Sequence, residues 1–289
     1  MPRSHFSRRM PIHGNPQTSV APALARVTAD VTVQEQLDAV LQERLALHAE
    51  LFQAAQIQRK LSGARTLHQG EMQFASEVFA ANYLSGDFVV LSQDGPKVLT
   101  TVGDIAGKGF AAGMWFTNLA GLLQSYSHPQ SDPGQTAAEV NRHLCYLRPV
   151  APFVTAFLTQ MDCDTGRLTY CNAGHFPPIL LRADGCTETL EKGGPLLGAV
   201  EDAAFESAQV TFGFGDMLVA YSDGVLECRN AAGEEFGMVR LVRAVQNAKQ
   251  PTAQETLVRL LAAAQDFANG NSLCDDLTLL VIQRDLSHE

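Results

Sequence analysis

Apolar residues recur at steps of three and four from Thr32 onward, the spacing that places side chains on one face of a helix. This face is formed by Val33, Leu37, Val40, Leu47, Leu51, Ala54 and Leu61. Thr32 and Glu35 have the spacing of a capping box, which satisfies backbone N–H groups at the start of a helix. The pattern therefore predicts a long helix over residues 30–62.

Arg44 and Gln58 fall on the same face, so the apolar repeat of this helix is imperfect. An amphipathic helix must pack its apolar face on something. It can pack on its own domain, or on the same helix of a second copy to form a homodimer through residues 32–61 that transmits a signal. The sequence leaves both alternatives open, and we assign residues 30–62 as a regulatory or dimerisation helix.

The preceding residues, 1–29, have no periodic apolar face. They contain Arg3, Arg8, Arg9 and Arg26 but no Asp or Glu, among several Pro and Ser residues. Such a composition offers little apolar surface to bury, so we expect a flexible basic tail.

Beyond residue 62 the chain is built of short apolar or β-branched runs bounded by Gly, Asp or Pro, which predict strands. These runs are 98–102, 153–161, 168–172, 179–182, 217–221 and 277–282. Helical spacing instead marks 110–127, 136–147, 237–248 and 252–268. Asp164-Thr-Gly166 predicts a hairpin turn. Because the helices do not alternate regularly with the strands, we predict a layered α+β domain over residues 63–289.

Composition narrows the classes of protein that this chain can be. The formal net charge of −10 excludes a general nucleic-acid binder, because phosphate backbones require clustered Lys and Arg. No stretch approaches the roughly 18 apolar residues of a membrane span. The six Cys form no CxxC pair and several lie in apolar runs, so we expect reduced thiols and a cytoplasmic protein.

Four separate segments place Asp where a strand ends or a turn begins. They are Ser85-Gly-Asp87, Gly103-Asp104, Asp223-Gly224 and Asp275-Asp276. A single Asp beside Gly is common in turns, but four carboxylates that converge would repel one another unless divalent cations neutralised them. Hard oxygen ligands suit Mg²⁺ or Mn²⁺, so the sequence predicts a site for one of these ions.

Seven short motifs follow one another along the chain. They are Gly86-Asp-Phe88, Gly103-Asp-Ile-Ala-Gly-Lys-Gly109, Phe153-Val-Thr-Ala-Phe157, residues 164–175, Gly193-Gly-Pro-Leu-Leu-Gly198, Ser222-Asp-Gly-Val-Leu-Glu227 and Asp275-Asp-Leu-Thr278. In this order they resemble the motifs of the PPM-type metal-dependent protein serine/threonine phosphatases. More narrowly, they resemble the bacterial SpoIIE-like branch, which includes regulators of sigma-factor pathways. The resemblance extends from about residue 53 to about 284. It implies an antiparallel β-sandwich flanked by α-helices in αββα layers, after the long N-terminal helix.

The same resemblance implies roles for individual residues. The positions that match the family's metal-binding carboxylates are Asp87, Asp104, Asp223 and Asp275. Ile105 matches the position that contributes a backbone carbonyl, and Gly224 and Asp276 would be close neighbours. In that arrangement two cations activate a water for in-line attack on a phosphomonoester. The implied reaction is hydrolysis of phosphoserine or phosphothreonine on a protein, with a STAS-like anti-sigma-factor antagonist as the implied substrate.

Lys108 and His175 are two further candidates. Lys108 lies between two Gly but lacks the spacing of a nucleotide P-loop, so it either attracts a phosphoprotein or is an ordinary solvated lysine. His175 follows a Gly-containing turn, so it either donates a proton to a leaving oxygen or has a structural role.

One departure from the family pattern favours a rival hypothesis. The family has an acidic residue three positions after the first Asp, where this chain has Val90. Loss of that carboxylate could weaken one metal site, which puts the metal stoichiometry in doubt. The chain could then be a catalytically weak or inactive module that binds a partner with the same fold. A third hypothesis is a phosphatase of a small phosphate ester.

Overall fold

The computed structural model describes residues 20–128, 131–247, 252–270 and 275–285, and of residues 20–32 the helical backbone only. The chain divides into two units, Met1–Glu50 and Leu51–Glu289. Helix α1 (Val20–Leu61) begins in the first unit and ends in the second.

Helix α1 begins at Val20, earlier than the predicted start at residue 30, so the prediction of a flexible tail is corrected for residues 20–29. The rest of that tail, residues 1–19, lies outside the described residues. Three Ala and a Leu in residues 20–25 favour a helix. Pro22 is tolerated because it lies in the first turn, where backbone N–H groups have no hydrogen-bond partner within the helix. The capping-box pattern at Thr32 therefore falls inside a helix.

The second unit contains two sheets in which neighbouring strands are often not consecutive in the sequence. The paired strands are antiparallel, except for the parallel pair β6–β9. The first sheet has the order β10-β6-β5-β4-β3, with β9 beside β6. Its strands are β3 (Asp87–Asp94), β4 (Lys97–Ile105), β5 (Val154–Asp162), β6 (Arg167–Ala173), β9 (Gly193–Gly194) and β10 (Ala208–Thr211). The predicted hairpin at Asp164-Thr-Gly166 is confirmed, because it joins the antiparallel neighbours β5 and β6.

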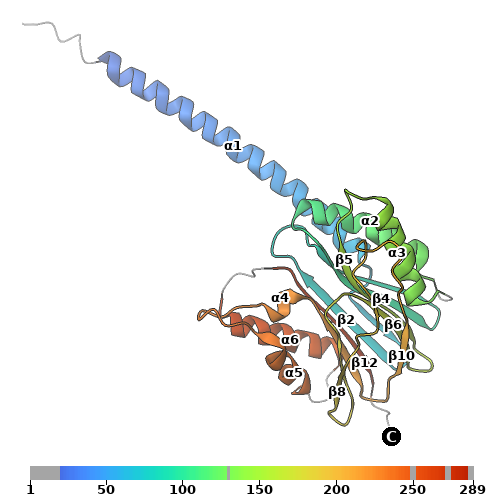
Figure 1. The fold of residues 1–289 in the computed structure, drawn as a ribbon. Coiled ribbons are helices and arrows are strands. Elements are labelled where there is room, and N and C mark those ends of the chain that lie inside the picture. The colour runs from blue at the N-terminus through green and yellow to red at the C-terminus, as the bar shows by residue number, and fades with distance from the viewer. Residues whose placement is uncertain (1–19, 129–130, 248–251, 271–274, 286–289) are drawn as a thin grey trace, which may run out of the picture. The chain divides into compact units, whose positions relative to one another are not determined.

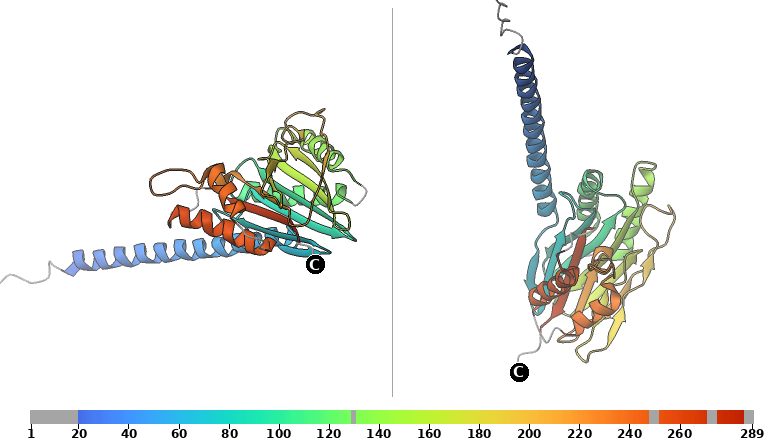
Figure 2. Two further views of the ribbon diagram at one scale, coloured as in Figure 1. Left: turned by 90° about the horizontal axis from the view of Figure 1, so that it is seen from below. Right: turned by 90° about the vertical axis from the view of Figure 1, so that its left-hand side faces the viewer.

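The second sheet has the order β1-β2-β12-β11-β7-β8. Its strands are β1 (Thr66–Gln69), β2 (Met72–Phe79), β7 (Ile179–Leu181), β8 (Thr187–Thr189), β11 (Met217–Tyr221) and β12 (Leu277–Arg284). Figures 1 and 2 show the two sheets facing each other. Five further helices complete the described part of this unit: α2 (Phe110–Tyr126), α3 (Pro133–Tyr146), α4 (Asp223–Leu226), α5 (Gly237–Gln246) and α6 (Ala253–Ala268).

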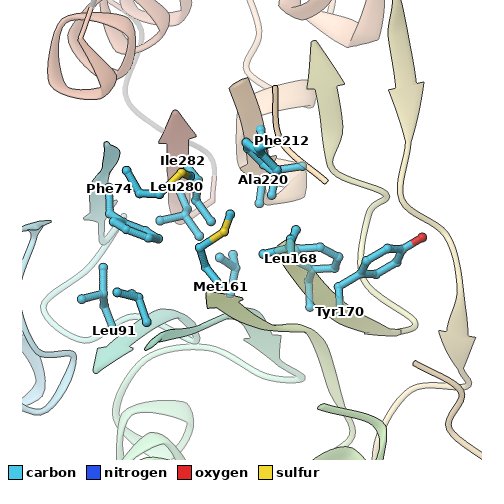
Figure 3. Close-up of a cluster of buried hydrophobic side chains, with 14 of the residues drawn as sticks. Phe74, Leu91, Met161, Leu168, Tyr170, Phe212, Ala220, Leu280 and Ile282 are labelled. Atoms are coloured by element: carbon cyan, nitrogen blue, oxygen red, sulfur yellow. The ribbon is translucent and has the colours of Figure 1, made fainter. Parts of the chain in front are cut away.

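Three apolar clusters hold these layers together. The first fills the space between the sheets, where Phe74, Met161 and Leu280 meet (Figure 3). The second lies between the β11–β12 sheet and helices α5 and α6, and the third between the β3–β4 sheet and helices α2 and α3. The predicted α+β sandwich flanked by helices is thus confirmed.

Phe157→Ala is expected to lower the free energy of unfolding by about 3–5 kcal/mol, because it removes a fully buried ring from the inter-sheet core. Equilibrium denaturant unfolding measures the change. Tyr146→Ala is the control, since this side chain is 85% exposed. Equal losses in the two variants would contradict the assignment of Phe157 to the core.

Candidate metal centre

Two of the predicted carboxylates lie side by side at one end of the first sheet. Asp87 opens β3 and pairs directly with Asp104 near the end of β4, which in turn pairs with Thr155 of β5. Directly paired residues of antiparallel strands project from the same face of a sheet. This face also carries Val89 and Val102 of the inter-sheet core, so both carboxylates border the space between the sheets.

The other two segments reach the same end from the second sheet. Strands β11 and β12 are antiparallel neighbours, so the residues that follow β11 lie beside those that precede β12. The junction is fixed by hydrogen bonds from the backbone N–H of Ser222 to the carbonyl of Thr278 (3.1 Å), and from the N–H of Thr278 to Ser222 Oγ (3.0 Å). Asp223 follows at the start of α4, and Asp275 precedes β12.

Electrostatics show that the four segments converge. Burial, together with the smaller effect of the negative charges of Asp223, Asp275 and Asp276, raises the pKa of Asp104 from 3.8 to about 6. Burial also raises the pKa of Asp87 well above its ordinary value, with contributions from Asp104 and Asp276. The pKa of Asp223 is raised by burial and by Asp275. These carboxylates are therefore close enough to disfavour one another's ionisation.

Asp276 uses its carboxylate to hold the loop that precedes β3. Its Oδ2 accepts hydrogen bonds from Ser85 Oγ (2.7 Å) and from the N–H of Gly86 (2.8 Å), and its Oδ1 accepts one from the N–H of Ala81 (2.8 Å). Asp276 thus joins the two sheets across the carboxylate cluster and orients the residues immediately before Asp87.

Two glycines permit close backbone approach at this end. A methyl group on Gly86 would lie 3.0 Å from the carbonyl oxygen of Ile105 and 3.3 Å from Asp104 Oδ1. On Gly224 it would lie 2.0 Å from the carbonyl oxygen of Asp276, which only glycine avoids. The first contact also shows that the Ile105 carbonyl and the Asp104 carboxylate face the same point.

The donor set fits a hard divalent cation. Asp87 Oδ2 is buried without a hydrogen-bond partner, and it stands beside the carboxylate of Asp104. A buried carboxylate oxygen without a partner is costly unless a cation or proton satisfies it. Among the side chains that the structure describes, no three from Asp, Glu, His or Cys residues are grouped closely enough to hold an ion. The oxygens converge on one region without yet forming a closed cage.

Lys108 lies at the mouth of this cluster. Its Nζ is 2.6 Å from Asp275 Oδ2, and this hydrogen bond raises the pKa of the exposed ammonium group above its ordinary value. Asp275 Oδ1 also accepts a hydrogen bond from the N–H of Asp276 (3.0 Å). Lys108 is therefore paired with a carboxylate of the site, unlike the fully solvated lysine that the sequence left open.

His175 is buried beside the carboxylate centre. Burial lowers its pKa to about 4, so its ring is neutral at physiological pH. Its Nδ1 lies 3.1 Å from Thr155 Oγ1, and its backbone N–H donates to Asn172 Oδ1 (2.8 Å). Because only 5% of the residue is exposed, the arrangement favours a structural role over proton donation to a bound substrate. His175 supports Thr155, the cross-strand neighbour of Asp104.

Val90 faces away from the carboxylates. Residues alternate along β3, so Phe88 and Val90 pack toward helices α2 and α3, whereas Val89 lies on the same face as Asp87. The Val90 side chain is 7% exposed and belongs to the third apolar cluster. An acidic residue at this position of the strand would enter that apolar layer, so valine here is explained by packing.

Sequence reasoning missed three residues that organise the centre. The sequence shows Thr155 within a family motif, Ser85 two residues before Asp87 and Gln58 as an interruption of the helix repeat, and it gives none of them a role in the centre. The position of Gln58 on the apolar face of the helix was the only indication in the sequence, because a polar residue on such a face often has a polar partner. Gln58 in fact contacts Ser85 in the loop before Asp87.

Comparisons with known proteins identify the family of this chain. The model of the family Stage II sporulation protein E (SpoIIE) matches residues 94–285, well over half of the chain. The chain is 26% identical over 241 residues to the phosphoserine phosphatase RsbU of Bacillus subtilis, covering 82% of this chain and 71% of RsbU.

Solved structures show the same fold. The SiaA-PP2C domain of Pseudomonas aeruginosa superposes with a TM-score of 0.72 at 17% identity, over 84% of this chain and 98% of that domain. RsbX in complex with magnesium superposes with a TM-score of 0.59 at 16% identity, over 76% of this chain and 98% of RsbX.

None of the helices in the described ranges is long and apolar enough to cross a membrane.

Asp104→Asn is expected to stabilise the metal-free protein at about pH 7.5 and to have little effect at about pH 4. Because the pKa of Asp104 is raised on folding, its ionisation disfavours the folded state as pH rises from 3.8 through about 6, and the penalty persists above that. Thermal unfolding in chelator at both pH values measures the difference.

The control is Asp94→Asn, which changes an exposed carboxylate at the other end of β3. Asp94→Asn should not reproduce the stabilisation that is expected of Asp104→Asn at the higher pH. A wild-type protein that is as stable as Asp104→Asn at the higher pH would contradict the crowding of charge described above.

Proposed function

This chain belongs to the SpoIIE family of protein serine/threonine phosphatases, and we propose that its carboxylate centre hydrolyses phosphoserine or phosphothreonine on a regulatory protein. One observation carries the proposal: four segments bring Asp87, Asp104, Asp223 and Asp275 to one end of the sandwich, where burial and neighbouring carboxylates raise the pKa values of Asp87, Asp104 and Asp223. Such crowding of carboxylates is expected where a protein is built to bind cations.

We assign the metal ligands to these four carboxylates and to the carbonyl oxygen of Ile105. Oxygen ligands favour Mg²⁺ or Mn²⁺, and the related fold of RsbX was solved with magnesium. We propose two ions, which would supply an activated water and offset charge on the phosphoryl oxygens. Asp87 and Asp104 would hold such ions together, because they pair directly across β3 and β4.

The surrounding residues have separate tasks in this proposal. Lys108 places a positive charge at the mouth of the cluster, where it can attract the phosphate of a substrate once cations compete for Asp275. Asp276 and Gly224 hold the loops on either side, and His175 supports Thr155 beside Asp104. No side chain of the described cluster is needed as a covalent nucleophile, since the attacking group is water.

The substrate that we propose is a small phosphorylated protein of the STAS-like anti-sigma-factor antagonist class. The support is the likeness to RsbU, a phosphoserine phosphatase, together with the motif resemblance to regulators of sigma-factor pathways. We also propose a cytoplasmic location, because Cys145, Cys163, Cys171 and Cys186 form no disulfide.

We further propose that residues 32–61 form a homodimer through the apolar face of α1. Val33, Leu37, Val40 and Leu47 are each at least half exposed. Helices with apolar residues at this spacing pair to remove such a face from water. In this proposal dimerisation regulates the phosphatase, and residues 30–62 form a regulatory segment.

Asp104→Asn is expected to reduce turnover by more than the roughly 100-fold that loss of an outer-shell partner can cost. The measurement is phosphate release from a phosphoserine protein with Mn²⁺ present and then removed by chelator. Wild type should turn over only with metal, and Asp94→Asn, at the far end of the same strand, should retain activity.

Three other results would change the proposal. Full activity of Asp104→Asn would refute the site assignment. No turnover by wild type with any divalent cation would favour an inactive binding module. Preference for free nucleotides or small phosphate esters over the phosphoprotein would favour a small-molecule phosphatase.

Leu37→Glu combined with Leu47→Glu is expected to convert a dimer to a monomer, because two charges would enter the apolar interface. Sedimentation velocity measures the state, and phosphate release reports its effect on activity. Ala39→Glu with Gln42→Glu adds the same charge at exposed positions off that face and should remain dimeric. A monomeric wild type with full activity would refute regulation by dimerisation.

A further inference from the structure

The end of α1 contacts the loop before Asp87 through a single side chain. Gln58 Nε2 donates a hydrogen bond to the carbonyl of Ser85 (2.7 Å), and Gln58 Oε1 accepts one from the N–H of Ser85 (3.2 Å). One amide thus satisfies both backbone polar groups of a residue 27 positions away. Ser85 is 3% exposed, so water cannot readily replace these bonds.

The same loop residue is tied to the carboxylate centre. Ser85 Oγ donates to Asp276 Oδ2, which also accepts from the N–H of Gly86. The carbonyl of Gly86 accepts a hydrogen bond from the N–H of Ile105 (3.1 Å). Residues 85 and 86 therefore link Gln58 to Asp276, which directly precedes β12 of the second sheet, and to Ile105 of the first sheet.

A second attachment fixes the base of α1 on the far side of Asp87. The carbonyl of Ser62 accepts a hydrogen bond from the N–H of Leu91 (3.0 Å), and Gly63 forms an isolated bridge with the same residue. A methyl group on Gly63 would lie 2.2 Å from the Leu91 carbonyl oxygen, so the approach is close. The helix end is therefore attached to the chain both before and after Asp87.

We propose that Gln58 is a positioning residue for the metal centre, which fixes Ser85 and thereby sets the places of Asp87 and Asp276. This inference rests on the proposed function and extends it to a residue that lies outside the carboxylate motifs. Loss of the Gln58 contacts leaves the donor set intact but lets the loop before Asp87 move. The cation then binds less tightly, because part of its binding free energy must order the loop.

The test compares Mn²⁺ binding by the full chain and by two variants. Gln58→Met keeps the length of the side chain but removes both hydrogen bonds, and Gln58→Asn keeps the amide on a shorter side chain that cannot reach Ser85. Gln56→Met is the matched control, because Gln56 is exposed two residues away on the same helix. Calorimetry gives the Mn²⁺ dissociation constant, and phosphate release is followed as Mn²⁺ is varied.

Both Gln58 variants are expected to bind Mn²⁺ about tenfold more weakly than wild type, the scale of loss for an outer-shell partner. Their kcat at saturating Mn²⁺ should approach the wild-type value, which a general loss of folding would not allow. Gln56→Met should match wild type in both measurements. Thermal unfolding in chelator shows that each variant is folded, and either Gln58 variant alone suffices for the comparison.

The outcomes separate this inference from the proposed function. If wild type binds Mn²⁺ and a folded Gln58 variant binds it equally well, the positioning role is wrong while the metal centre stands. If wild type binds no Mn²⁺, the proposed centre itself is wrong. If Gln56→Met is weakened as much as the Gln58 variants, the effect belongs to the helix in general and the role of Gln58 is refuted.

Discussion

Repulsion among carboxylates is the constraint on which the arrangement at the end of the sandwich depends. Folding brings Asp87 and Asp104 into direct cross-strand pairing and places Asp223 and Asp275 near them. Like charges opposite one another destabilise a sheet, so the inter-sheet core must supply the free energy that this end gives up. In the proposed metal centre, stability is thus exchanged for the capacity to bind cations.

The sandwich makes such an arrangement possible because its two sheets end at the same place. Each carboxylate lies in, or two residues from, a strand that has buried residues on both of its faces, so the backbone that carries it is rigid. Asp276 then spans the gap between the sheets with hydrogen bonds to the loop before β3. The strands thus determine where the carboxylates lie, and the hydrogen bonds of Asp276 to the loop before β3 hold the backbone next to Asp87 in place.

Much of this fold could be predicted from the sequence, because several strands are continuous apolar runs. Met217–Tyr221 is an example, since it is buried on both faces and has no polar position to obscure it. Strand β2 (Met72–Phe79) was missed because it mixes Gln, Ser and Glu with its apolar residues. The start of α1 was placed too late because the Thr32 pattern resembles a cap but lies within the helix.

The candidate carboxylates could be named from their motifs, but their supports could not. The bond from Ser85 to Asp276 joins residues 191 positions apart, and no local pattern encodes such a pairing. The packing of Val90 depended on which face of β3 meets helices α2 and α3, which only the assembled sheet decides. Sequence motifs therefore identify the candidate carboxylates, whereas tertiary contacts determine which residues position them.

The contact between Gln58 and Ser85 has a consequence for how this centre can vary. Gln58 binds only the main chain of Ser85, whereas the hydroxyl of the same residue binds Asp276. A substitution at position 85 can therefore alter the bond to Asp276 and leave the attachment of the helix in place. Evolution can therefore change the hydrogen bond between residue 85 and Asp276 while the hydrogen bonds between Gln58 and the main chain of residue 85 are kept.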